Sequence, residues 1–384
     1  MKFSCLELFV IILLFFTFYV SSGMVAAGVF FESSFGADYL TGMLIVGGIT
    51  ILYTLFGGFL GASLTDVAQG ILMFAALIVV PIVAVINMGG VGETIAAIEA
   101  VDPARLNILT GGTALGIISA AAWGLGYFGQ PHIIVRFMAL RNPQEATAAR
   151  RIGISWMMLT CLGAISTGLI GIGYFAAHPE VSLDNPETVF LVLSQILFHP
   201  FVAGLVLAAV LAAIMSTISS QLIVTSSALV EDLYKIIRKK EASENSLVMF
   251  GRMGVLVVAV VAILIALDRN STILELVGFA WAGFGASFGP IVLLALFWKK
   301  LTNWGAIAGL ATSAATVFIW GNLPIGDVLY EIIPGFAINL IVTIVVSLLT
   351  YKRNDAIELE FDRAVELARP GRRPRSEPKV DETV

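Results

Sequence analysis

Three oxygen-bearing positions lie close together in the segment LAAIMSTISSQL, residues 211–222. Ala213, Ser216 and Thr217 stand at i, i+3 and i+4, so in a helix one main-chain carbonyl and two hydroxyls share a face. Hard cations take oxygen ligands, and neutral oxygens would hold a monovalent cation loosely enough to release it. The same spacing fits an ordinary hydrogen bond from Thr217 back to the carbonyl of Ala213, and spacing alone favours that interpretation.

A second segment, WGLGYFGQPHI at residues 123–133, combines aromatic rings with residues that weaken a helix. Three glycines precede Pro131, so a helix here can open backbone groups toward a cavity. Trp123 and Tyr127 are four residues apart and would share a helix face. Their rings and the tyrosine hydroxyl would suit the apolar body of a small zwitterion. A purely structural aromatic stripe fits the spacing about equally well.

The remaining polar residues in apolar segments give weaker signals. Tyr19 stands in LLFFTFYVSSG, residues 13–23, where a tyrosine with one hydrogen bond is more typical of packing. His132 and the two other histidines fall near the ends of apolar runs, which favours an interfacial role. There is no HExxH motif, and residues 188–230 contain no charged side chain. The sequence therefore offers no metalloprotease motif, and this apolar run offers no buried acid for a proton pump.

The elements that position these residues must be membrane helices. Of 384 residues, 58% are hydrophobic and only 13% are charged, with a mean hydropathy of +0.94. Ordinary soluble domains have about 25% charged residues. This composition excludes nucleic-acid binders, cytosolic enzymes and disulfide-stapled secreted domains. It predicts an all-α polytopic membrane protein.

About ten apolar runs are long enough to cross a bilayer, which takes about 20 residues. They cover residues 8–31, 40–62, 67–88, 113–135, 152–177, 188–230, 248–267, 276–298, 304–321 and 332–351. The sixth run is too long for one crossing, and Pro200 is expected to divide it into an interfacial helix, residues 188–198, and a span. A cleavable signal peptide is an alternative for the first run, but its continuation to residue 31 and the early Glu7 favour a span.

The chain thus divides into a membrane transport domain, residues 1–351, and a tail, residues 352–384. The tail is charged and contains proline, so we expect a largely disordered cytoplasmic extension. Its basic stretch RPGRRPR is an alternative site for contact with lipid.

The basic residues indicate how the chain is oriented in the membrane. When successive loops are assigned to alternate sides of the membrane, 20 of the 22 Lys and Arg residues fall on one side, and Arg105 and Arg269 fall on the other. Because basic residues concentrate in the cytoplasm, both termini are predicted to be cytoplasmic and the protein to lie in the cell membrane.

Several long motifs closely resemble those of the sodium/proline symporters in the solute:sodium symporter family. They are the two segments described first together with LLFFTFYVSSG, GGFLGASLTD, SSALVEDLYK, FAWAGFGASFGP and YEIIPGF. The resemblance therefore runs from the first span to the last. It implies a LeuT-type bundle of two inverted five-helix repeats that imports L-proline with Na⁺. In this resemblance Ala213, Ser216 and Thr217 match sodium-site positions. Tyr19, Trp123, Tyr127 and Pro131 match positions of the proline site.

The chain departs from that family in its number of spans. The family has thirteen, and the match here begins at what would be the fourth, so we expect an incomplete bundle that lacks the first three transmembrane helices. Those helices would have to be supplied by a longer gene product. A non-transporting fragment or an accessory membrane subunit of the same fold is therefore the alternative function. A proton-coupled carrier is disfavoured by the lack of buried acids.

Overall fold

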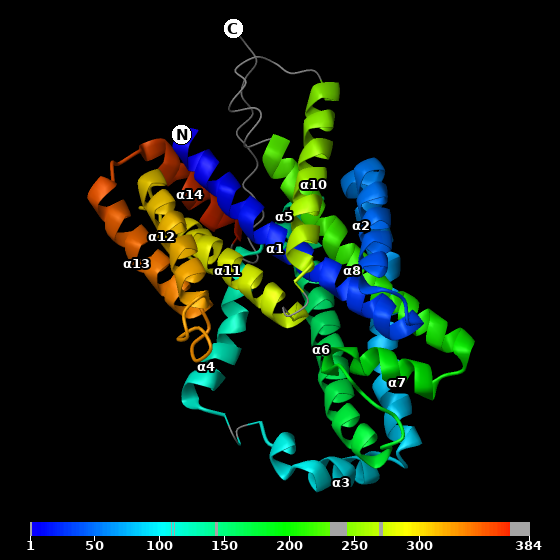
Figure 1. Ribbon diagram of the computed structural model, residues 1–384. Helices are drawn as coiled ribbons and strands as arrows, with labels where there is room; N and C mark the ends of the chain where they lie inside the picture. The colour runs from blue at the N-terminus through cyan, green and yellow to red at the C-terminus, as the bar shows by residue number, and fades with distance from the viewer. Residues whose placement is uncertain are drawn as a thin grey trace.

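The computed structural model describes residues 2–108, 110, 112–142, 145–230, 244–268 and 272–368, and the regular secondary structure of this part is helical throughout (Figure 1). The long helices are α1 (Lys2–Phe35), α2 (Tyr39–Asn87), α6 (Glu145–Ala177), α8 (Pro200–Ser227), α10 (Glu244–Ala266), α11 (Ile273–Phe297), α12 (Asn303–Gly321) and α13 (Ile332–Thr350). Shorter ones are α3 (Val91–Val101), η1 (Pro103–Leu106), α4 (Ala114–Ala122), η2 (Trp123–Gly129), α5 (Pro131–Met138), η3 (Pro186–Thr188), α7 (Val189–Leu197) and α14 (Asp355–Ala368).

Nine segments of this part are long and apolar enough to cross a membrane. They are Val10–Phe35, Tyr39–Gly57, Leu60–Asn87, Glu145–Ala177, Pro200–Val230, Ser246–Ala266, Ile273–Phe297, Asn303–Gly321 and Ile332–Thr350. Two of them lie in α2, whose 49 residues would measure about 74 Å if straight, more than twice a bilayer core. Nine of the ten predicted spans are confirmed as apolar helices. The other, residues 113–135, is broken into three pieces.

Pro200 divides the longest apolar run as the sequence predicted. The short helix α7 ends at Leu197, and α8 begins at Pro200. Proline is favoured in the first turn because its missing N–H would have no partner within the helix there. The run therefore contains one short helix and one full-length span.

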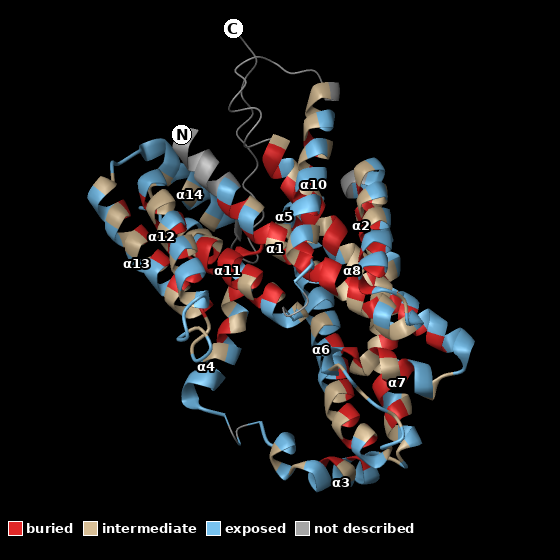
Figure 2. Cartoon of the chain, viewed as in Figure 1, coloured by how far each residue is buried: buried red, intermediate tan, exposed pale blue. Residues whose placement is uncertain are grey.

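The centre of the molecule is the crossing of α1 and α11, where the buried residues gather (Figure 2). Phe15, Phe16 and Phe284 are fully buried, and the rings of Phe16 and Phe284 are 4.4 Å apart. The close crossing requires small residues on α11. A Cβ on Gly283 would lie 2.1 Å from the ring of Phe15.

A buried asparagine on α13 joins α11, α12 and α13. Pro290 lies inside α11 and has no N–H, so the carbonyl of Ala286 loses its usual partner four residues on. The side-chain amide of Asn339 donates to that carbonyl and to the carbonyl of Ser287, both at 2.7 Å. The amide also donates to Ser313 on α12 at 3.2 Å. A side chain of α13 thus replaces the backbone bond that the proline removes.

The tail differs from the sequence prediction. We expected largely disordered chain after residue 351, but α14 forms at Asp355–Ala368, so the prediction is wrong for that stretch. Asn354 caps its first turn by accepting from the N–H of Ala356 at 3.1 Å. Glu358 and Asp362 then approach Lys299, between α11 and α12, at 3.9 and 3.7 Å. Residues 369–384, with the RPGRRPR stretch, lie outside the described residues.

Candidate functional site

The predicted span at residues 113–135 is interrupted where its sequence is richest in glycine. The α-helix α4 ends at Ala122, the 3₁₀ helix η2 follows, and Gln130 is extended with φ −82° and ψ 108° before α5 begins. The residue before a proline is pushed out of helical geometry, which places the break at Gln130. The predicted weakening of this helix is confirmed.

The glycines of η2 let it pack directly on α11. A Cβ on Gly126 would lie 1.9 Å from the indole nitrogen of Trp281. A Cβ on Gly129 would lie 2.4 Å from the carbonyl oxygen of Phe284 and 2.8 Å from the backbone nitrogen of Gly289. Real Cβ atoms do not approach other atoms this closely, so glycine is required at both positions.

Trp123 and Tyr127 meet through Trp281, a residue that the sequence did not single out as a site residue. Trp123 stacks on Trp281 with centroids 5.4 Å apart, and the indole N–H of Trp281 donates to the Trp123 carbonyl at 2.9 Å. Tyr127 meets the same indole edge-on at 4.8 Å. Tyr330 stacks on Trp123 at 6.0 Å. The four rings form one group, which we call the aromatic cluster.

The reason for the contact differs from the one expected. Their spacing of four residues predicts that Trp123 and Tyr127 share one face of an α-helix. In a 3₁₀ helix, with 3.0 residues per turn, positions i and i+4 point about 120° apart. Both rings nevertheless reach Trp281 because η2 lies against α11.

Tyr19 and Pro131 lie at the other end of the break. Tyr19 on α1 is buried, and its ring meets the ring of His132 edge-on at 5.7 Å. His132 directly follows Pro131, while the amide of Gln130 donates to the carbonyl of Trp281 at 3.2 Å. Neighbouring contacts therefore connect all four predicted substrate residues. His132, which the sequence favoured as interfacial, packs against α1 and links Tyr19 to Pro131.

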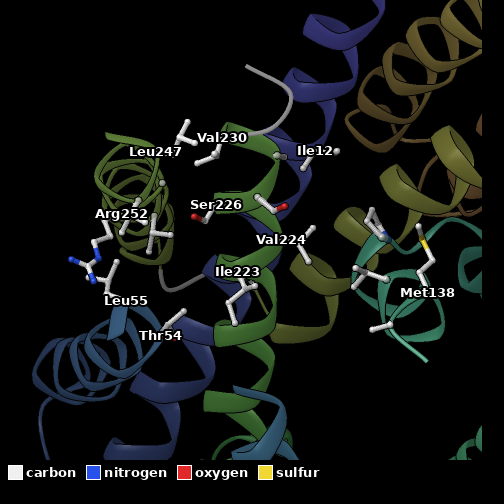
Figure 3. A pocket seen from close by; sticks show the side chains of 18 residues that line it. Ile12, Thr54, Leu55, Met138, Ile223, Val224, Ser226, Val230, Leu247 and Arg252 are labelled. Atoms are coloured by element: carbon white, nitrogen blue, oxygen red, sulfur yellow. The ribbon is translucent and has the colours of Figure 1, made fainter. Parts of the chain in front are cut away.

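A cavity lies at each end of the broken segment. One, of about 710 Å³, is lined by Trp123, Phe279, Tyr330 and Glu331, and we call it the Tyr330 cavity. Burial raises the pKa of the Glu331 carboxyl above its ordinary value. The other, of about 1020 Å³, is lined by the residues drawn as sticks in Figure 3, Pro131 and Arg252 among them, and we call it the Arg252 cavity. The segment from Trp123 to Pro131 thus stands between two spaces.

The three candidate cation ligands meet on α8 as their spacing predicted. The hydroxyls of Ser216 and Thr217 donate to the Ala213 carbonyl at 3.0 and 2.9 Å. This is also the back-bonded arrangement, in which each hydroxyl keeps lone pairs for a cation. Three neutral oxygens at one point fit a monovalent cation chemically. Their role as ligands stays a prediction.

The cation candidates and the aromatic cluster are separate groups. Ala213 lines a third cavity, of about 380 Å³, to which η2 contributes no residue. One turn beyond Thr217, Ser220 accepts a hydrogen bond from Arg136 of α5 at 2.8 Å, and Arg136 also pairs with Asp66 of α2 at 2.6 Å. The hydrogen bond to Ser220 connects the helix of the cation candidates to the helix that begins at Pro131, and the ion pair connects the latter to α2. The residues that the structure describes contain no cluster of His, Cys, Asp or Glu suited to a metal.

The chain matches the Sodium:solute symporter family over residues 4–312. It is 57% identical over 353 residues to the high-affinity proline transporter PutP of Bacillus subtilis, covering 92% of this chain and 74% of that protein. It is 55% identical over 343 residues to the osmoregulated proline transporter OpuE of the same organism, covering 88% and 69%. It is 52% identical over 369 residues to a sodium/proline symporter of Staphylococcus aureus, covering 94% and 72%.

A solved structure supports the fold. A Na⁺-coupled sialic acid symporter, in its substrate-bound outward-open state, superimposes with a TM-score of 0.72 over 91% of this chain and 75% of its own length. At 19% sequence identity, this likeness concerns the architecture alone.

Proposed function

The chain belongs to the Sodium:solute symporter family, and from that membership we propose that it is a secondary transporter that imports L-proline with Na⁺. The observation that carries the proposal is identity of 52–57% to proline transporters over most of the chain. Membership also makes it a multi-pass membrane transporter rather than an enzyme. The predicted supply of further helices by a longer gene product stays a prediction.

The broken segment suits a carrier that exposes one site to two sides in turn. Irregular backbone at membrane depth is tolerated where it lines a cavity, and carriers often hold substrate at such a break. Trp123 faces the Tyr330 cavity and Pro131 faces the Arg252 cavity. We assign Tyr19, Trp123, Tyr127 and Pro131 to the substrate site, where the rings would enclose the pyrrolidine ring of proline.

The oxygens of α8 suit the coupling ion. A hard monovalent cation takes about five or six oxygens, by analogy with other hard cations, and Ala213, Ser216 and Thr217 offer three. The bond between Ser220 and Arg136 joins this helix to the start of the substrate site. Occupancy of the ion site can therefore bias the position of α5.

Sodium-dependent uptake tests the proposal. Proteoliposomes containing the full chain and given an inward Na⁺ gradient should accumulate labelled L-proline at least about tenfold faster than with choline in place of Na⁺. The ratio of initial rates is the measurement. Equal rates with both cations would refute sodium coupling, and sodium-dependent binding without uptake would favour the non-transporting alternative.

We further propose that both termini are cytoplasmic, so that the Arg252 cavity faces the cytoplasm and the Tyr330 cavity faces outward. The support is the distribution of Lys and Arg, with 20 of 22 on one side. A reporter active only in the cytoplasm should be active when fused after Val384. The same reporter inserted after Asn107, in the loop carrying Arg105, should be silent at equal expression. The reverse pattern would invert the topology.

A further inference from the structure

Two buried polar atoms beside Pro131 have no hydrogen-bond partner. Gln130 is fully buried, and while its side-chain N–H donates to Trp281, its oxygen Oε1 is unpaired. The nitrogen Nδ1 of His132 is likewise enclosed and unpaired. Buried polar groups are normally paired, because leaving one unpaired costs much of its hydration free energy. Two such atoms within three residues call for a partner that this conformation does not provide.

Their position connects the two halves of the proposed substrate site. Gln130 is held against α11 at Trp281, in the aromatic cluster, while His132 packs against Tyr19 and Phe16 of α1. Pro131 between them has no N–H to offer. A ligand held by Tyr19 on one side and the aromatic cluster on the other would meet both atoms.

The chemistry of the two atoms selects a donor with two N–H groups. An amide oxygen can only accept, and Nδ1 accepts in one tautomer of neutral imidazole. A carboxylate cannot donate, so it would leave the oxygen of Gln130 unpaired. The secondary ammonium of proline carries two N–H groups and a positive charge, which makes hydrogen bonds to neutral acceptors stronger.

We propose that Gln130 Oε1 and His132 Nδ1 accept the two N–H groups of the substrate ammonium. The assignment rests on the proposed function and adds the residues that recognise the amine. Both atoms are enclosed here, so substrate reaches them when the start of α5 and α1 move apart. The missing partners favour that opening, because the ammonium then supplies the bonds that the closed form lacks.

Analogues that differ by one N–H test the proposal in the full chain. Competition against labelled L-proline binding in Na⁺ gives dissociation constants for L-proline, N-methyl-L-proline and α-methyl-L-proline. The first two differ by one N–H, whereas α-methyl-L-proline adds the same methyl group and keeps both. Wild type should bind N-methyl-L-proline about tenfold more weakly than α-methyl-L-proline, the loss of one charge-assisted bond.

In Gln130→Met or His132→Phe that ratio should fall to within about twofold of unity, because one acceptor is gone. His132→Asn, which keeps an acceptor near the Nδ1 position, should retain most of it. Gln195→Met is the matched control, since Gln195 also donates to a backbone carbonyl, that of Ser34 at 3.0 Å, and lies outside the site. It should leave the ratio unchanged.

The outcomes separate this proposal from the proposed function. If wild type binds no L-proline in Na⁺, the function itself fails. If it binds proline but the analogue ratio survives both Gln130→Met and His132→Phe, the residues do not recognise the amine. An equal loss of affinity for all three ligands would make their role structural and overturn the assignment.

Discussion

Gly129→Ala should lower the rate of sodium-dependent proline uptake by at least about 100-fold. Its new methyl group would sit 2.4 Å from the carbonyl oxygen of Phe284 and 2.8 Å from the backbone nitrogen of Gly289. Backbone atoms inside α11 cannot rotate aside, so η2 must shift away from the helix. Displacement of a binding group by about 1 Å commonly costs a factor of about 100 in rate. The shift would also break the bond between Trp281 and the carbonyl of Trp123.

Gly124→Ala is the control because it makes the same change in the same 3₁₀ helix. No atom lies within 4 Å of the position that its Cβ would take. We expect uptake within about twofold of wild type, since alanine also favours helix over glycine. Initial rates normalised to the amount of protein in the membrane would compare the two variants. Similar rates for both would show that the contact between η2 and α11 is not needed for transport.

Thr217→Ala should raise the Na⁺ concentration for half-maximal uptake by about tenfold, corresponding to the loss of one of about five or six oxygens around the ion. The hydroxyl of Thr217 meets the carbonyl of Ala213 at 2.9 Å, next to that of Ser216. Thr217→Ser keeps this oxygen and should change the Na⁺ requirement by less than about twofold. Uptake at saturating proline across a series of Na⁺ concentrations gives the values.

Thr225 provides the control for Thr217 on the same helix. Its hydroxyl bonds back to the carbonyl of Gln221 at 2.8 Å, the same i to i−4 pattern in a buried setting. If back-bonding were the whole role of Thr217, both alanine variants would leave the Na⁺ requirement alone. A tenfold shift in Thr217→Ala without one in Thr225→Ala would identify Thr217 as a ligand. An unchanged requirement in both would refute that role.

The spans could be predicted because each is a local property of the sequence. Twenty apolar residues in a row are enough to indicate a membrane helix, and Pro200 marks a break by its own chemistry. The helix α14 could not be predicted in this way. Its sequence is amphipathic and too rich in acidic residues for a span, and it docks on Lys299, which lies more than fifty residues earlier.

The candidate site could be predicted in part. Glycines and Pro131 revealed the break in the helix, because their effect on backbone geometry is local. The contacts of Trp281, Tyr330 and His132 join segments that are far apart in the sequence, which no spacing within one segment reveals. A tryptophan within a run of small residues, FAWAGFGASFGP, is the signal that could have pointed to Trp281.

The hydrogen bonds of Asn339 determine where the molecule can flex. A proline within a membrane helix usually creates a hinge, because the helix loses a hydrogen bond there. At Pro290 the side chain of Asn339 replaces the missing backbone bond. Bending α11 there would break the hydrogen bonds of Asn339 to Ala286, Ser287 and Ser313 together. At Gln130, by contrast, the side chain makes no hydrogen bond to the start of α5, and its amide donates to the carbonyl of Trp281 on α11 instead. We therefore expect α11 to move as one rigid helix and the chain to bend at Gln130.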